Sequence, residues 1–313
     1  MQPQKMKKKN FEYRKVFFLI MILAILLPLG CHKTELDQIS DANTELLVKL
    51  KEFNESYSIN NIGNSNLKSA QGFWSKVGDA VVVSGADLIG AAGGALAVKE
   101  LAVAAGLATG GTGAAVVMGA GAVIAGGGAS VTAYRGLKSA NMSNSISEVY
   151  SENLNIIYPA KYKDLAHCGY NHNKEVFSVL HGDSSYSYLK SGTLNNDDQT
   201  IFECSEWKSI VEEINSSVNQ YKLSKNTDEL IESIESKSLI TNETSLVLKI
   251  FFDIYNQIEQ SEHVEDIINF YIESISTTQC LTEEEKISLV CSFSVASESI
   301  FLWLNQYYDE SAN

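Results

Sequence analysis

LAVAAGLATGGTGAAVVMGAGAVIAGGGASVTAY, residues 101–134, runs for 34 positions without a charged side chain, and nine of those positions are glycine. It is the middle of a longer segment, residues 77–136, which holds 15 glycines, many alanines and five charged residues. A disordered linker is the least favoured interpretation, because linkers are normally rich in Ser and this segment is rich in Ala and Val.

Small residues recur at every fourth position in two series, from Ala86 to Ala114, with Val98 as an exception, and from Gly121 to Ala133. Residues four apart share one face of a helix, and small residues there let two backbones approach closely. Between the series, TGGTG is suited to a turn. The pattern predicts a glycine-zipper-like hairpin with arms at about 87–108 and 114–134, whose expected helix-packing residues are Gly90, Gly94, Gly106 and Gly110.

Two environments for this hairpin stay open. Its length suits a bilayer, but insertion is marginal, because Leu, Ile and Val each favour insertion by only about 0.3–0.6 kcal/mol and glycine takes many positions. Lys99 and Glu100 also add charge to the first arm. The alternative is a hairpin buried within the protein's own helical fold. A phosphate-binding loop is not favoured, since the chain has no G-x4-G-K-[ST] sequence.

The segment from residue 145 to the end is poor in glycine, acidic and rich in Ile, Phe and Tyr. Thr227 and Thr241 are expected to cap helices, and Thr282 to Glu285 form a capping box. Residues 182–200 are expected to be a long loop. The predicted fold class is mainly α, with the glycine/alanine-rich hairpin followed by a C-terminal bundle of about five helices. The apolar stripes that predict these helices lie within residues 207–221, 230–234, 246–258, 264–275 and 287–304.

AHCGYNHNKEVFSVLHG, residues 166–182, is the stretch whose residue types are best suited to chemistry. It holds three of the five histidines, His167, His172 and His181, beside Cys168. Two His and one Cys can bind Zn²⁺ when the backbone turns them inward, but their spacing matches no standard ligand motif. His167, Cys168 and His172 are therefore candidates for a metal site or a structural polar group. The favoured interpretation is that His172 and Asn173 cap or bridge helices. We expect no catalytic residue, no bound metal and no cofactor.

The N-terminus has the layout of a secretory signal. Six Lys/Arg and one Glu lie within the first 15 residues, and the 15 residues Val16 to Gly30 that follow carry no charge. A membrane-spanning helix would need about 20 apolar residues. Leu27-Pro28-Leu29-Gly30-Cys31 resembles the lipobox of bacterial lipoproteins, whose cysteine is acylated, for example with palmitate, and becomes the mature N-terminus. The resemblance implies a signal peptide over residues 1–30 and lipidation of Cys31, with an ordinary secretion signal or an uncleaved anchor as the alternatives.

Three landmarks occur in order along the mature chain: Trp74-Ser75-Lys76-Val77-Gly78-Asp79, Gly169-Tyr170-Asn171-His172-Asn173, and Ser294-Val295-Ala296 with Ser299 and Trp303. They resemble the W-x-K-V-x-x-A-D-x-x-G-A, G-x-x-H-N and S-V-A-x-x-S-x-x-x-W segments of bacterial lipoproteins of the Bacteroidetes type. That family has no established activity, so the resemblance implies an architecture. We expect an acidic helical lead-in and loop at 31–76, the hairpin at 77–136 and an α-helical domain at 145–313.

The net charge, the cysteines and the absence of certain motifs argue against several classes of function. The net charge is −14, and it becomes −19 when residues 1–30 are removed, so nucleic acid is not an expected partner. In an oxidising compartment, Cys168, Cys204, Cys280 and Cys291 allow three pairings, between which the sequence does not choose. The chain has no CxxC, GxSxG or HExxH motif, so redox and hydrolytic functions have no motif in their favour.

These observations favour a lipid-anchored cell-envelope protein, in the outer membrane rather than the inner one, that is not an enzyme. Its expected partner is the membrane, through the lipid on Cys31 and through the hairpin where that inserts. The protein partner is unknown at this stage. The alternatives are a binding or structural lipoprotein with a buried hairpin, and an envelope hydrolase centred on His172.

Overall fold

The computed structural model describes the backbone of residues 32–62, 67–107, 112–137, 154–182, 194, 196–257 and 261–309. It is 87% helical and no described residue lies in a strand, which confirms the mainly α prediction. The chain divides into a unit of residues 1–45 and a compact unit of residues 46–313. The predicted signal peptide and Cys31 lie outside the described residues.

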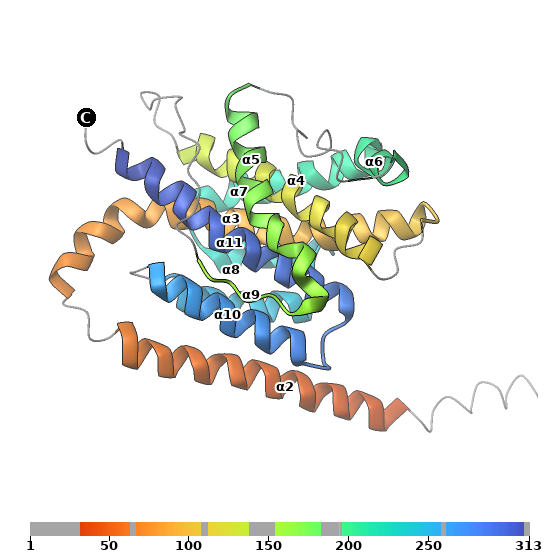
Figure 1. The fold of residues 1–313 in the computed structure, drawn as a ribbon, viewed down its shortest axis with the longest axis horizontal. Helices are drawn as coiled ribbons and strands as arrows, with labels where there is room; N and C mark the ends of the chain where they lie inside the picture. Colours follow the sequence, from red (N-terminus) through yellow and green to blue (C-terminus); the bar gives the residue numbers. More distant parts are fainter. Residues whose placement is uncertain are drawn as a thin grey trace, which may run out of the picture. The chain divides into compact units, whose positions relative to one another are not determined.

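Figure 1 shows the order of the helices along the chain. The described elements are α2 (His32–Tyr57), η2 (Ser58–Ile62), α3 (Leu67–Ala104), α4 (Thr112–Leu137), η3 (Ala160–His167), α5 (Cys168–Leu180), α6 (Asn196–Glu203), α7 (Ser205–Ser224), α8 (Thr227–Ser236), α9 (Asn242–Tyr255), α10 (Ser261–Thr277) and α11 (Glu283–Asp309).

Helices α3 and α4 are the two arms of the glycine-rich segment. Helix α3 begins at Leu67, well before the predicted start of the first arm, and the turn residues 108–111 lie outside the described residues. Helix α3 packs against α4, α11, α7 and α8, and α4 also packs against α5 and α7 (Figure 1). The hairpin and the C-terminal helices therefore belong to one compact unit, although composition alone divided them at residues 136–145.

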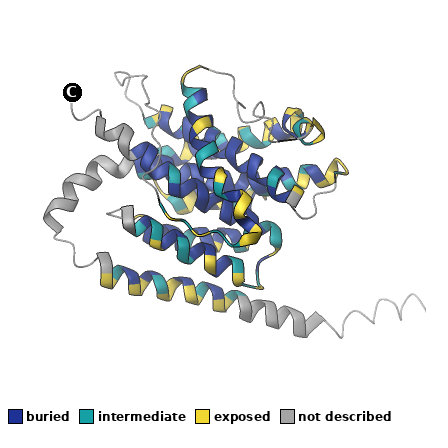
Figure 2. Cartoon of the chain, viewed as in Figure 1, coloured by how far each residue is buried: buried dark blue, intermediate teal, exposed yellow. Residues whose placement is uncertain are grey.

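Most residues of the two arms are buried between Ala80 and Ala97 and between Ala114 and Tyr134 (Figure 2). Among the described residues, Ala80–Ala104, Gly113–Leu137 and Glu283–Trp303 are long and apolar enough to cross a membrane by length and composition. In the most apolar part of each, 89% of the residues are buried by the rest of the fold. The apolar surface that would favour a bilayer is thus covered by other helices of the same chain.

The arms contact each other through small residues. A Cβ atom added to Gly90 would lie 2.7 Å from Cβ of Ala129, and one added to Gly121 would lie 2.5 Å from the carbonyl oxygen of Gly94. A Cβ atom on Gly94 would collide with Cβ of Ala125 and with the carbonyl oxygen of Gly121, both in α4. The two series of small residues therefore face each other, and α3 and α4 approach at backbone distance.

The prediction for Gly106 is wrong. Gly106 lies just after the end of α3 with φ +72°, and a Cβ atom there would meet nothing within 4 Å. This residue ends the helix in a left-handed conformation that glycine adopts without strain, and it does not line the helix contact. Gly110 lies outside the described residues.

Lys99 and Glu100 lie near the end of α3, where they reach solvent. The Lys99 ammonium is 3.1 Å from the Glu100 carboxylate and 4.0 Å from that of Glu284, and the two side chains of the first pair are 25% and 73% exposed. This charged pair marks the end of the enclosed part of the arm.

The later helices follow the predicted stripes, with three local differences. Thr241 caps α9, but α8 is capped by Asn226 rather than Thr227. Leu246, assigned to the α9 stripe, is 37% exposed because it lies on the face opposite the core. Part of the expected 182–200 loop is α6, whose first turn carries acids that favour a helix N-terminus.

The capping box at the start of α11 is confirmed. The Glu285 carboxylate accepts from the backbone N–H of Thr282 at 2.7 Å, and the Thr282 hydroxyl accepts from that of Glu285 at 3.3 Å.

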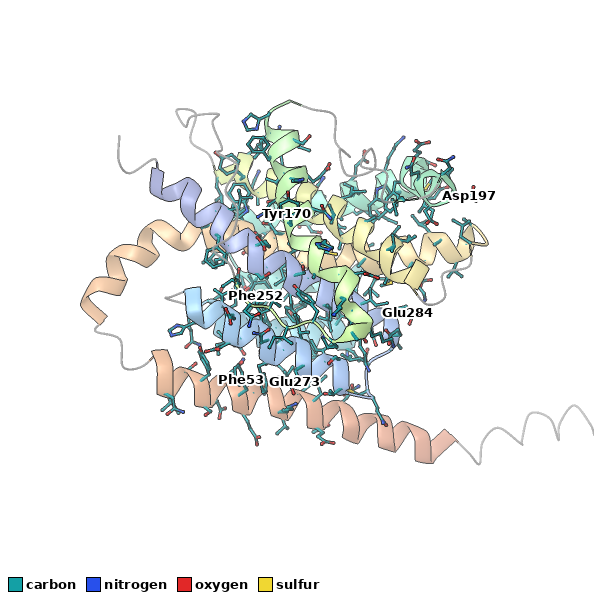
Figure 3. All side chains as sticks on the ribbon, in the orientation of Figure 1. Phe53, Tyr170, Asp197, Phe252, Glu273 and Glu284 are labelled. Carbon is teal, nitrogen blue, oxygen red and sulfur yellow. The ribbon has the colours of Figure 1, made fainter. Side chains whose placement is uncertain are left out.

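Acidic side chains of the outer helices, such as Asp197 of α6 and Glu273 of α10, are exposed (Figure 3).

The part of α2 that belongs to the compact unit, residues 46–57, packs through aromatic and amide contacts. Phe53 stacks on Phe270 with 3.7 Å between ring centroids. The Asn54 side chain donates to the carbonyl of Ile250 and accepts from the Tyr271 hydroxyl. This part of α2 also buries Leu46 and Leu50, so its apolar face is part of the compact unit.

Candidate functional site

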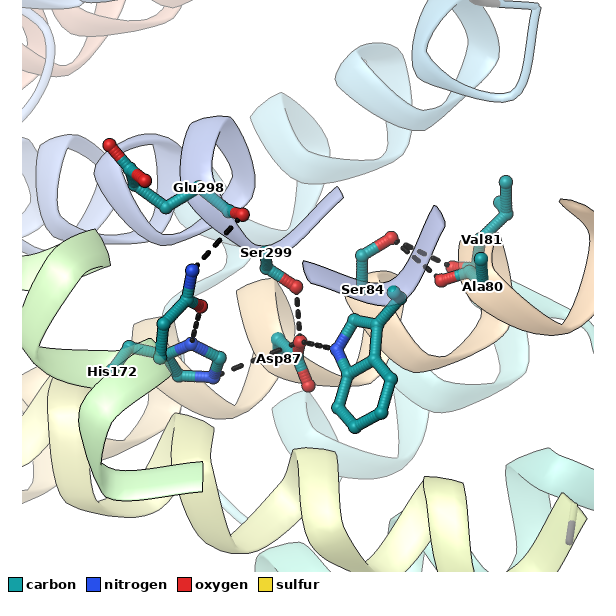
Figure 4. Close-up of polar contacts among 9 residues, drawn as sticks. Ala80, Val81, Ser84, Asp87, His172, Glu298 and Ser299 are labelled. Atoms are coloured by element: carbon teal, nitrogen blue, oxygen red, sulfur yellow. Dashed lines mark hydrogen bonds and ion pairs between the residues drawn. The ribbon is translucent and has the colours of Figure 1, made fainter. Parts of the chain in front are cut away.

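Asp87 is a fully buried carboxylate in α3. The Ser299 hydroxyl and the Trp303 indole N–H, both from α11, donate to its Oδ2 atom, the latter at 2.9 Å (Figure 4). Ser299 and Trp303 are four residues apart, so they share one face of α11. This carboxylate therefore ties the first arm of the hairpin to the last helix of the chain.

His172 of α5 approaches the same carboxylate from another side. Its Nε2 atom lies 3.8 Å from Asp87 Oδ2, and its Nδ1 atom lies 3.1 Å from the side-chain oxygen of Asn173 (Figure 4). The Asn173 amide in turn donates to the carbonyl of Glu298 at 3.2 Å. Gly126 of α4 leaves room for the ring, since a Cβ atom there would lie 3.2 Å from it.

The largest influence on the pKa of Asp87 is its burial away from water. Burial raises the pKa of Asp87 above its ordinary 3.8, and the nearby His172 ring, with the hydrogen-bond donors around the carboxylate, opposes that rise. Ser130 of α4 also faces the carboxylate and lowers its pKa, although its hydroxyl does not reach hydrogen-bond geometry. Asp87 Oδ1 has no hydrogen-bond partner among the described residues. The cluster thus joins α3, α4, α5 and α11 around one poorly solvated carboxyl group.

The geometry suits bridging better than catalysis. Ser299 donates to Asp87, the same oxygen that His172 approaches, so the serine is not aligned with the ring as a nucleophile beside its base. Asp87, His172 and Ser299 are all 0% exposed. A surface hollow lined by residues such as Lys51 and Asp253 includes none of the cluster. These contacts support the interpretation that His172 and Asn173 bridge helices.

The three residues proposed for a metal or polar group do not converge. His167 is exposed at the start of α5, and the Cys168 thiol lies 3.7 Å from that of Cys291, whereas His172 faces Asp87. Within the described ranges, no group of three or more His, Cys, Asp and Glu side chains is arranged to hold a metal ion. His181 caps its own helix, with Nδ1 2.9 Å from the carbonyl of Phe177.

Sequence reasoning missed Asp87 as the centre of this cluster. The available signal was weak, because Asp87 is one acidic residue among the small and apolar residues around it. The second and third landmarks contribute to the cluster, His172 and Asn173 from the second and Ser299 and Trp303 from the third, whereas Asp87 lies outside the first.

Comparison with protein-family models, with curated proteins and with solved structures finds no match for this chain. The contacts of the Asp87 cluster fix the position of the hairpin relative to α5 and α11.

Proposed function

We propose that this chain is a lipid-anchored protein of the cell envelope whose helical domain is a non-catalytic binding or structural module with the hairpin as its interior. An acyl chain on Cys31 attaches it to the membrane, in the outer membrane rather than the inner one. The observation that carries the proposal is the burial of both arms of the hairpin by the rest of the fold.

The interior position of the hairpin is supported by contacts that a bilayer would not supply. Moving Asp87 into hydrocarbon would cost about 2.5–3.5 kcal/mol and would remove the hydrogen bonds from Ser299 and Trp303. The two series of small residues already face each other within the hairpin. The remaining faces of α3 and α4 are covered by α5, α7 and α11.

A second candidate is a hairpin that leaves the bundle and enters a bilayer. It is favoured by the length of the two apolar stretches, 25 residues each. Insertion would require α5, α7 and α11 to separate from the hairpin and would break the Asp87 cluster, so this candidate needs a large opening of the unit.

The attachment is tested first. The N-terminal peptide of the mature protein is expected to begin at Cys31 and to carry acyl chains, and the Cys31→Ser variant is expected to lose them. Mass spectrometry of that peptide from the membrane fraction is the readout. An unmodified residue 31 in the wild-type protein contradicts the proposed lipid anchor.

The hairpin is tested in a lipid-free protein, obtained by replacing residues 1–31 with an ordinary cleavable secretion signal. We expect it to leave the membrane fraction in alkaline carbonate, and to do so equally when Lys99 and Glu100 are both replaced by Leu. In a bilayer, that exchange would remove a penalty of about 2.5–3.5 kcal/mol per charge and strengthen retention. Retention of the lipid-free protein that increases with the exchange would favour the inserted hairpin.

A further inference from the structure

Two cysteines that lie 123 positions apart in the sequence meet in the interior of the compact unit. Cys168 is the first residue of α5 and Cys291 lies in α11, and their sulfur atoms are 3.7 Å apart. Both side chains are buried, 5% and 0% exposed. The fold therefore holds two thiols in contact without any local sequence motif.

The contact is fixed by the residues beside the two thiols. The backbone N–H of Gly169 donates to the Ser294 hydroxyl at 3.1 Å, and that hydroxyl lies 3.3 Å from the carbonyl oxygen of Ala166. A Cβ atom at Gly169 would collide with the backbone of Ser294. The start of α5 therefore approaches α11 at backbone distance, one turn from Cys291, and this approach sets the positions of both sulfur atoms.

The other two cysteines have separate surroundings. The Cys204 sulfur accepts from the backbone N–H of Trp207 at 3.3 Å and caps α7. The Cys280 sulfur lies 2.9 Å from the Thr278 hydroxyl, in the turn before α11. The geometry therefore supports a bond between Cys168 and Cys291, which occurs in one of the three pairings that four cysteines allow.

We propose that Cys168 and Cys291 form a disulfide bond when the chain folds in an oxidising compartment. The two thiols give up two protons and two electrons to a small or protein disulfide oxidant, whose own S–S bond breaks to give two thiols as the new bond forms. A disulfide needs its sulfur atoms about 2.05 Å apart, so the side chains have to close the remaining gap by rotation. The proposal rests on export of the chain to the envelope, as proposed above.

The bond is expected to form during folding rather than afterwards. The contact with Cys168, together with burial, raises the pKa of the Cys291 thiol. Since the thiolate is the reacting form, the enclosed pair exchanges slowly with any oxidant or reductant. Once formed, the bond joins α5 to α11 beside the Asp87 cluster and holds His172 and Asn173 over the hairpin.

The test uses the full-length protein purified from the envelope, with free thiols alkylated during unfolding, and non-reducing peptide mass spectrometry. We expect one pair of peptides, containing Cys168 and Cys291, joined at a mass about 2 Da below their sum, with Cys204 and Cys280 alkylated. The Cys204→Ser variant is the matched control and keeps the joined pair. Reduction is expected to lower the Tm by about 10 °C, because the bond closes a long loop, and the Cys168→Ser variant should not respond to the reductant.

A second arm separates the pairing from the export on which it rests. The purified full-length protein is reduced, unfolded and refolded in glutathione buffer that contains the oxidised form. A Cys168–Cys291 bond that forms there supports the pairing even where the envelope sample carries thiols, and thiols in the envelope sample would then count against export. Absence of the bond in both samples, or a bond from Cys168 to Cys204 or Cys280, overturns the inference.

Discussion

Replacement of Gly121 by Ala tests the close contact between α3 and α4 with the smallest possible change. The added Cβ atom would lie 2.5 Å from the carbonyl oxygen of Gly94 and 2.5 Å from a methyl carbon of Val98. Both distances are roughly 1 Å shorter than an ordinary van der Waals contact, so the two arms have to move apart. Overpacking of this kind costs about 1–3 kcal/mol.

The helix propensity of alanine acts in the opposite direction and needs a control. Alanine is favoured over glycine in a helix by at most about 1 kcal/mol. Gly113, in the first turn of the same helix, is exposed, and a Cβ atom there would meet nothing within 4 Å. The Gly113→Ala variant therefore gains helix propensity without steric overlap. The difference in stability between the two variants then reports the cost of overpacking at the contact between α3 and α4.

We expect Gly121→Ala to melt about 2–12 °C below Gly113→Ala, since 1 kcal/mol corresponds to about 2–4 °C in a domain of this order of size. The assay is a thermal melt of the lipid-free protein in detergent-free buffer, followed by circular dichroism at the helix band. Equal melting temperatures would refute the argument that the two series of small residues pack against each other.

Two further predictions concern the polar contacts. Because burial raises the pKa of Asp87, its protonated form is favoured by folding, so its contribution to stability is fully present below pH 3.8 and is lost as the pH rises through the folded-state pKa. The Asp87→Asn variant lacks this dependence, and its stability relative to wild type, measured by denaturant unfolding, should rise as the pH is raised above 3.8; a difference that does not change with pH contradicts this. Thr282→Ala removes one half of the capping box at α11 and should cost about 1 kcal/mol in the same assay, whereas the exposed Thr200→Ala control should change little.

Local patterns predicted most of the helices because their causes are local. The spacing of small residues placed Gly90 and Gly94 on one face, and the order Thr-Glu-Glu-Glu placed the start of α11, since both depend on residues within a few turns. The two wrong predictions, for the cap of α8 and for Gly106, also have local reasons. Asn226 precedes Thr227 and caps better, and Gly106 supplies a left-handed residue at the end of a helix, which its place in the series did not indicate.

The polar cluster could not be predicted in the same way because its partners are distant in sequence. Ser299 and Trp303 lie 212 and 216 positions from Asp87, and no periodic pattern connects them. An aspartate in an apolar helix rich in small residues is a weak signal, and only the packing of α5 and α11 on the hairpin gives it partners. The same holds for Cys168 and Cys291, whose contact depends on how α5 starts against α11.

Hydrogen exchange of the backbone amides tests most directly whether the hairpin is the interior of a folded module. The lipid-free protein is measured in aqueous buffer without detergent, at peptide resolution. We expect amides of α3 from Ala80 to Ala104 and of α4 from Gly113 to Leu137 to be as strongly protected as those of α11, because all three lie in the buried part of one cooperative unit. Amides of the two arms that exchange within seconds while α11 stays protected would contradict the account.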